Sequence, residues 1–167
     1  TQPLLSLNKL VEDPDDPGTF VDGPVTIDGS GSPVTYQTVI TNNGTGPAHN
    51  INLSDDYDSV VFGLPTLTLV EMDSDDDGTF ETVLVSGTDY TANLGTDPFT
   101  IDFSGGTSAT VLPVDGSIRI TYTMTPDSDT GSGASIDNSQ DVDWSSSDSG
   151  EARDYDDGND SDYTNDE

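Results

Sequence analysis

The sequence contains no cysteine, one histidine and only three lysine or arginine residues in 167 positions. Without cysteine there are no disulfide bonds and no thiolate metal ligands. One histidine and no cysteine leave zinc sites and nucleophilic triads without the residues that they use. The scarcity of basic side chains argues against nucleic acid and anionic membrane surfaces, because both are bound through Lys and Arg. No run approaches the roughly 20 apolar residues of a membrane-spanning helix, so we expect no direct membrane insertion.

Acidic residues dominate the chain instead. Thirty-three of them give a formal net charge of -30, while only 30% of the residues are hydrophobic. Low hydrophobicity with high net charge is typical of disordered chains. The apolar residues are nevertheless concentrated in short alternating runs, as in a folded β-protein. We therefore expect a folded domain whose acidic surface needs cations, either salt or bound Ca²⁺, to offset the repulsion between its charges.

Signals for helices are nearly absent, and Val, Thr, Ile and Tyr dominate runs that Gly, Pro, Asn and Asp separate. This pattern is typical of strands joined by turns, and its regular spacing predicts an all-β, antiparallel β-sandwich over residues 1–145. Residues 12–32 are expected to form a long acidic loop, and Asn43-Gly44 predicts a hairpin turn between the second and third strands. The expected strands are Leu4–Val11, Val34–Thr41, Ala48–Asp55, Thr66–Met72, Phe80–Val85, Phe99–Phe103, Ser117–Thr125 and Asn138–Trp144.

Residues 146–167 are mostly Ser, Asp, Asn and Gly. Such a segment is too polar to fold by itself. We expect an acidic tail that is bound to calcium or docked on a neighbouring subunit.

Three polar side chains fall on strand faces that are otherwise apolar. The sole lysine, Lys9, is one of them, and the other two are Asp55 and Asn138. The two-residue period of a strand places them on the core side of three different strands. A lone buried charge is costly unless it is paired, so the three together suggest a common purpose. The shared faces are Leu5, Leu7, Lys9 and Val11; Ile51, Leu53 and Asp55; and Ile136, Asn138, Gln140, Val142 and Trp144.

An intramolecular isopeptide bond would give these residues such a purpose. Burial disfavours charge on an amine or a carboxylic acid. A neutral Lys9 amine could attack the side-chain carbonyl of Asn138 while a protonated Asp55 polarises that carbonyl and transfers protons, with loss of ammonia. One alternative is a buried Lys9–Asp55 ion pair with Asn138 as a hydrogen-bonded neighbour. Another is a register shifted by one residue, which would turn all these side chains outward.

Three segments carry a resemblance to a known family. They are Leu7-Asn-Lys-Leu-Val, the run from Val34-Thr-Tyr through Asn-Asn-Gly and Pro-Ala to Asp55, and Ile136-Asp-Asn-Ser-Gln. Over residues 5–145 they resemble the conserved repeat domain found in tandem in bacterial and archaeal surface proteins, although Gln140 stands where a small apolar residue is usual. The resemblance implies an immunoglobulin-like sandwich that serves as a stalk or spacer. Some related surface domains carry Lys–Asn isopeptide bonds, which supports the roles given to Lys9, Asp55 and Asn138.

Acidic loops provide candidate calcium ligands. Asp73, Asp75 and Asp77 occupy alternate positions before Gly78, as in the first half of an EF-hand loop. Glu81 follows, but position 12 is Leu84, so the usual bidentate glutamate is missing. The alternative is a solvated acidic turn, which the same residues favour. Two further candidate clusters are Glu12, Asp13, Asp15 and Asp16, and Asp154, Asp156, Asp157, Asp160 and Asp162.

We therefore expect a non-enzymatic, extracellular structural module at a cell surface. It would serve as a stalk or spacer repeat beside other repeats of the same protein, or as a filament subunit that assembles with copies of itself by strand addition. The alternative is a carbohydrate-binding or adhesive module, an adhesin that binds glycan through exposed Tyr90, Tyr155 or Tyr163. His49 is expected to be exposed beside the Asn-Gly turn and without a catalytic role, and Trp144 and Tyr36 to lie in the core.

Overall fold

Alternating side chains set the architecture, because successive residues of a strand point to opposite faces of its sheet. Along Val34–Asn42 buried and half-buried residues alternate without exception, and Ser117–Met124 shows the same alternation. The computed structural model describes residues 2–22, 25–26, 31–126, 135–147 and 161–166; for 135–137 and 161–166 only the backbone is described. The strands are β1 (Leu5–Glu12), β2 (Phe20–Val21), β3 (Val34–Asn42), β4 (His49–Tyr57), β5 (Thr66–Asp73), β6 (Thr82–Val83), β7 (Thr91–Asn93), β8 (Phe99–Asp102), β9 (Ser117–Met124), β10 (Ser135–Ser145) and β11 (Ser161–Asp166).

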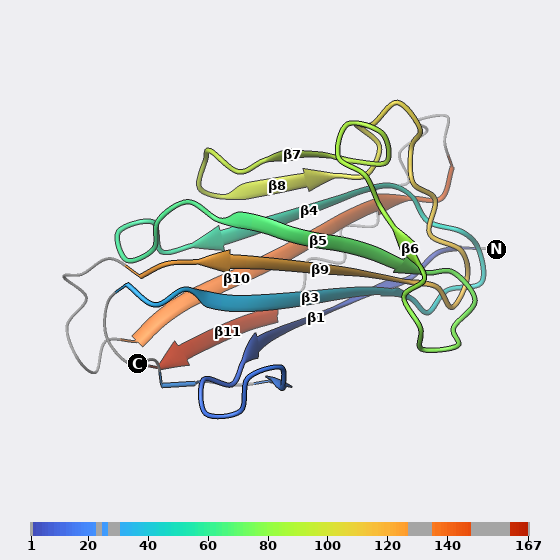
Figure 1. The fold of residues 1–167 in the computed structure, drawn as a ribbon. Coiled ribbons are helices and arrows are strands. Elements are labelled where there is room, and N and C mark those ends of the chain that lie inside the picture. The colour runs from blue at the N-terminus through green and yellow to red at the C-terminus, as the bar shows by residue number, and fades with distance from the viewer. Residues whose placement is uncertain (1, 23–24, 27–30, 127–134, 148–160, 167) are drawn as a thin grey trace.

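The strands form two antiparallel sheets that face one another (Figure 1). One has the order β2-β1-β3-β9-β5-β6, and the other the order β11-β10-β4-β8-β7. The first strand and β10, which comes late in the chain, therefore lie in different layers. Within the part of the chain that the structure describes, no helix could cross a membrane. The all-β sandwich predicted from the sequence is confirmed.

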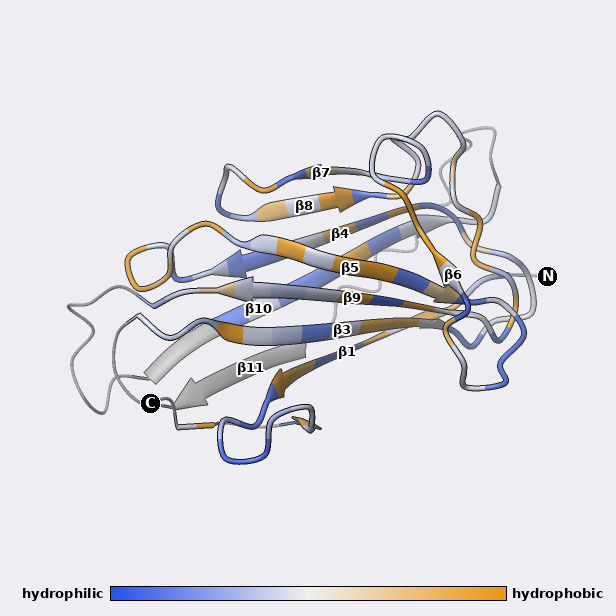
Figure 2. Cartoon of the chain, in the orientation of Figure 1, coloured by the Kyte–Doolittle hydropathy of each residue, from blue (hydrophilic) through white to orange (hydrophobic). Residues whose placement is uncertain are grey.

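The core lies between the two sheets. Apart from Lys9, its largest fully buried side chains are aromatic and branched aliphatic residues, among them Tyr36, Tyr122 and Phe99. Tyr36 and Tyr122 stack at 5.4 Å between ring centroids, and Phe99 meets Tyr122 edge-on at 5.2 Å. Full burial of such a side chain contributes about 1.5–3 kcal/mol. In Figure 2 orange, hydrophobic bands are interspersed with white and blue ones along the strands, whereas the loop between β5 and β6 is mainly hydrophilic.

Short strands are where sequence and structure differ. The expected strand Phe80–Val85 is reduced to β6, two residues long. Three strands were not predicted, β2, β7 and β11, and β2 lies inside the expected loop 12–32. Residues 161–166 of the expected tail form β11, which pairs with β10 of the same chain.

The hairpin expected at Asn43-Gly44 is wrong, because β3 and β4 belong to different sheets. The segment crosses from one layer to the other and receives the start of the chain, with Thr45 N–H donating to the Gln2 carbonyl over 2.7 Å. A Cβ on Gly44 would lie 2.4 Å from that carbonyl oxygen. Glycine is therefore required here for a close backbone approach and not for a hairpin turn.

Candidate functional site

Three polar side chains from three strands are buried between the sheets. Lys9 of β1, Asp55 of β4 and Asn138 of β10 are exposed by only 1%, 0% and 1%. Lys9 comes from the six-stranded sheet, and the other two come from neighbouring strands of the five-stranded sheet. The inward orientation predicted from strand alternation is confirmed, and a shifted register is ruled out for these strands.

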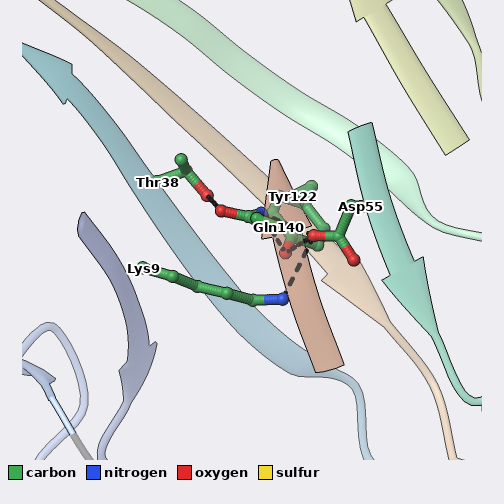
Figure 3. Close-up of polar contacts among 5 residues, drawn as sticks. All are labelled: Lys9, Thr38, Asp55, Tyr122 and Gln140. Atoms are coloured by element: carbon green, nitrogen blue, oxygen red, sulfur yellow. Dashed lines mark hydrogen bonds and ion pairs between the residues drawn. The ribbon is translucent and has the colours of Figure 1, made fainter. Parts of the chain in front are cut away.

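Asp55 is the centre of the cluster. Its Oδ2 atom accepts hydrogen bonds from Lys9 Nζ at 3.1 Å, from the Tyr122 hydroxyl at 2.6 Å and from Gln140 Nε2. Figure 3 shows the three donors converging on this one oxygen while the other points away from them. That other oxygen, Oδ1, is buried and has no hydrogen-bond partner among the described residues. The carboxyl group is thus held firmly by one oxygen and left open at the other.

Asn138 carries a polar group that the described core does not satisfy. Neither Oδ1 nor Nδ2 of its amide makes a hydrogen bond of ordinary geometry within the described residues. The amide does lie beside the Tyr122 hydroxyl. That hydroxyl in turn donates to Asp55, so Asn138 belongs to the same cluster. Leaving a buried donor or acceptor unpaired costs about 1–3 kcal/mol, so an asparagine here needs an explanation.

The surroundings shift the pKa of the two ionisable neighbours of Asp55, Lys9 and Tyr122. Burial lowers the pKa of Lys9 from 10.5 to about 8, although the charge of Asp55 and the hydrogen bond to it oppose this shift. Burial and then Asp55 raise the pKa of Tyr122 well above its ordinary value, against a smaller opposite effect of the Asn138 amide. Tyr122 therefore remains a neutral hydrogen-bond donor, whereas Lys9 can lose its proton near neutral pH. The Lys9 ammonium also lies 5.2 Å from the centre of the Tyr36 ring.

Two residues of the cluster were not given a role by sequence reasoning. Gln140 was grouped on the inward face of its strand, and the structure buries it to 3% exposure opposite Asp55. Its Oε1 accepts from the Thr38 hydroxyl at 2.9 Å. Tyr122 also occupies an inward position of its strand, but only the pairing of sheets brings it to Asp55. The alternation could have placed both residues in the core, without naming their partner.

The arrangement has the parts of an amide-forming centre. An amine whose pKa is lowered is a better nucleophile near neutral pH, and a buried carboxyl group can transfer protons. The acceptor is the buried side-chain amide carbonyl of Asn138. The chemistry that these groups can perform is amide exchange between Lys9 and Asn138 with release of ammonia.

The Asp73 loop brings four carboxylates together. Oxygens of Asp73, Asp75, Asp77 and Glu81 all lie within 4.8 Å of one another. Two oxygens that share a Ca²⁺ ion at 2.3–2.6 Å can be up to about 5 Å apart, so the donor set fits a calcium ion in chemistry and spacing. The loop is shaped by backbone N–H groups of Asp76 and Gly78, each donating to Asp73 over 2.9 Å.

Charge within this loop is unevenly distributed. Burial acts to raise the pKa of Asp73, but backbone N–H donors outweigh it and lower that pKa below its ordinary value. The neighbouring Asp77 raises the pKa of Asp75, followed by smaller effects of burial and Glu81. Asp75, Asp77 and Glu81 are exposed, and Leu84 at the twelfth position is buried.

The other two acidic clusters have different outcomes. Glu12 and Asp13 accept backbone hydrogen bonds of their own loop, from Gly18 N–H and Asp15 N–H. Apart from the Asp73 loop, no group of three carboxylates lies within ligand spacing in the described residues. Asp154, Asp156, Asp157 and Asp160 lie outside these residues, and only the backbone of Asp162 is described.

The predicted sugar-binding tyrosines do not form an exposed aromatic surface in the described part of the chain. Tyr90 is buried to 6% exposure and packs against Phe103, so its predicted exposure is wrong. Tyr155 lies outside the described residues, and only the backbone of Tyr163 is described. Trp144 and Tyr36 are core residues as predicted. His49 lies at the start of β4 and is half-buried, not exposed.

Comparison with known proteins supports the class of fold. No family model matches the chain, and no curated protein sequence matches it significantly. Among solved structures, the pilus backbone protein RrgB of Streptococcus pneumoniae has 18% identity and a TM-score of 0.59 over 86% of this chain and 32% of its own. The major pilin SpaD of Corynebacterium diphtheriae has 16% identity and a TM-score of 0.58, over 85% and 31%.

A third neighbour is similar in size to this chain. ACE19, the collagen-binding subdomain of the Enterococcus faecalis surface protein ACE, has 14% identity and a TM-score of 0.51 over 83% of this chain and 84% of its own. The chain spans about a third of the length of the two pilins. These likenesses establish an immunoglobulin-like β-sandwich of the kind found in pilin and surface-adhesin domains.

Proposed function

We propose that this chain is a structural module of an extracellular surface protein or fibre, locked by an isopeptide bond between Lys9 and Asn138. The observation that carries the proposal is the burial in one cluster of a lysine, a carboxyl group and an asparagine amide that has no hydrogen-bond partner among the described residues. A non-covalent core would gain little from this combination, since it leaves these polar atoms unpaired within the described part of the chain. The covalent product removes one of them, because the Asn138 nitrogen leaves as ammonia.

The reaction needs no external reagent. The Lys9 ammonium passes a proton to Asp55, and the neutral amine attacks Cγ of Asn138. Asp55 then moves a proton from the attacking nitrogen to the leaving nitrogen, the C–N bond to Nδ2 breaks, and ammonia departs. The lowered pKa of Lys9, about 8, makes the transfer of its proton to Asp55 less costly than it would be for an exposed lysine.

The bond would join β1 of one sheet to β10 of the other. A cross-link between strands from opposite ends of the sequence holds both layers together under pulling force and limits unfolding from either end. This is the property expected of a stalk repeat or a filament subunit, and the pilin and adhesin neighbours support this class of function. Such a module would be joined to further repeats or assembled with copies of itself.

Calcium at the Asp73 loop is the second part of the proposal. Four carboxylates within 4.8 Å would repel one another in a chain that already carries a net charge of -30. A divalent cation with oxygen ligands would offset this repulsion and fix the connection between β5 and β6.

Intact-mass spectrometry tests the bond. Loss of ammonia lowers the mass by roughly 17 Da relative to the sequence mass. Asp55→Asn keeps the shape of the side chain but cannot transfer protons in the same way, so it should restore the full mass. Asp56 is the matched control, because it lies next to Asp55 but faces solvent, and Asp56→Asn should keep the deficit. A wild-type chain at the full sequence mass would refute the bond.

Electron microscopy and light scattering across Ca²⁺ concentrations test whether the module is a filament subunit or a stalk repeat. Filaments that form from the purified chain would identify a self-assembling subunit. A monomer under all conditions would favour a stalk repeat, joined to its neighbours within one longer polypeptide.

A further inference from the structure

We propose that Gln140 is a positioning residue for the Lys9–Asn138 cross-link, holding Asp55 in place so that its Oδ2 atom faces the Lys9 amine and can exchange a proton with it. This inference rests on the proposed isopeptide bond and goes further, because it assigns a role to a residue outside the Lys–Asp–Asn set. Gln140 spans the core between the two sheets. Its amide is anchored on Thr38 of β3 and donates to Asp55 of β4 (Figure 3).

The two amides of β10 differ in a way that separates their roles. Gln140 is engaged at both ends, through Oε1 with Thr38 and through Nε2 with Asp55 and with the Tyr122 hydroxyl at 3.2 Å. Attack on its carbonyl carbon would break these bonds. Asn138, two residues earlier on the same face, has no such hydrogen bond among the described residues. Asn138 is therefore the amide available to react. Gln140 belongs to a hydrogen-bonded frame, which it forms with Thr38 and Tyr122 around Asp55.

That frame also reaches Lys9 through the sheet. Thr38 lies directly opposite Lys9 in the pairing of β1 with β3, and Gln140 lies directly opposite Asp55 in the pairing of β10 with β4. The Thr38–Gln140 hydrogen bond and the Lys9–Asp55 ion pair thus bridge the same two layers side by side. Gln140 fixes the distance over which the Lys9 amine meets Asp55.

Hydrogen bonds hold Oδ2 of Asp55 toward Lys9. Two neutral donors, Tyr122 and Gln140, and the Lys9 amine all point at this oxygen. The Lys9 proton therefore passes along the 3.1 Å hydrogen bond to Oδ2, the oxygen that the Gln140 amide holds in place. Without the Gln140 amide only Tyr122 and Lys9 would hold this oxygen.

The test measures the rate of bond formation separately from folding. The chain is recovered in acidic urea, where Lys9 is protonated and the chain unfolded, and its mass is checked to be that of the unlinked form. Refolding by dilution is followed by Trp144 fluorescence. The loss of ammonia is measured by intact-mass spectrometry of samples quenched in acid. Gln140→Met, which keeps the length of the side chain and removes its amide, should fold but form the bond about tenfold or more slowly.

Val142→Ala is the matched control. Val142 lies on the same face of β10, two residues beyond Gln140, and is buried to 8% exposure. Its truncation loosens the core without removing a donor to Asp55, so the bond should form at the wild-type rate once folding is complete. If a loss of packing alone slows the reaction, Val142→Ala will slow it as well, and the positioning role is then overturned.

A second variant covers the case in which Gln140→Met does not fold. Thr38→Val keeps the size of the side chain and removes only the hydroxyl that anchors Gln140, so it should also slow the bond. A wild-type rate in whichever of these variants folds would overturn the proposal while leaving the cross-link itself in place. A wild-type chain that never loses ammonia would instead refute the proposed isopeptide bond on which this inference rests.

Discussion

Replacing Asn138 by leucine distinguishes a cross-linked core from a non-covalent one by the sign of its effect. Leucine keeps the branching of asparagine at Cγ and removes both polar atoms. If the core is non-covalent, the substitution removes two buried atoms that have no hydrogen-bond partner in the described part of the chain, and such an atom costs about 1–3 kcal/mol. The variant should then be as stable as the wild type or more stable.

If the bond forms, the same substitution removes a covalent constraint. The link between Lys9 and Asn138 closes a loop of about 130 residues, which by analogy with disulfides limits the entropy of the unfolded chain by about 5 kcal/mol. We therefore expect Asn138→Leu to lower the free energy of unfolding by about this amount. At a urea dependence of about 2 kcal/mol per molar, the unfolding midpoint falls by about 2–3 M.

Urea unfolding followed by Trp144 fluorescence measures the effect, since Trp144 is the only tryptophan and is buried on β10, the strand that carries Asn138. Both proteins are compared at one high salt concentration, because the net charge of -30 makes stability sensitive to ionic strength. The control is the same substitution in a Lys9→Met background, where no bond is left to lose and leucine should be neutral or stabilising. A midpoint for Asn138→Leu at or above that of the wild type would refute the reasoning.

Three further predictions concern the pH dependence of the bond, its detection by chemical labelling and the calcium site. The rate of bond formation, followed by mass spectrometry, should be flat from about pH 6 to 7 and fall above about pH 8, because Lys9 then loses to solvent the proton that it must pass to Asp55; a rate that keeps rising to pH 9 would contradict this. An amine-reactive reagent applied in denaturant should label only the terminal amine of the wild type but two sites in Asn138→Leu, since Lys9 is the sole lysine. Saturating Ca²⁺ should raise the thermal midpoint by about 5–10 °C over chelator at constant ionic strength, as expected for a ligand near 100 times its dissociation constant. Asp75→Asn with Asp77→Asn should abolish that rise, and a rise unchanged in this variant would place calcium elsewhere.

Local periodicity determined the long strands and the faces that they bury. Alternating runs are read within a few residues, so the sequence alone placed Lys9, Asp55 and Asn138 on inward faces, as the structure confirms. The spacing of Asp73, Asp75 and Asp77 before a glycine is equally local, and the structure brings these carboxylates together with Glu81. A turn needs no distant partner to bring its own side chains close.

Tertiary structure decided everything that depends on which strands lie opposite one another. The local Asn43-Gly44 signal predicted a hairpin, but the burial of both sheets sends β3 and β4 to different layers. Strands as short as β2 and β7 contain too few residues for an alternating pattern to be recognised. They form by pairing with the edges of the longer strands β1 and β8. The Thr38–Gln140–Asp55–Tyr122 contacts join four strands across two sheets. Periodicity gives the face of each residue, whereas its partner is set by the packing of the whole chain.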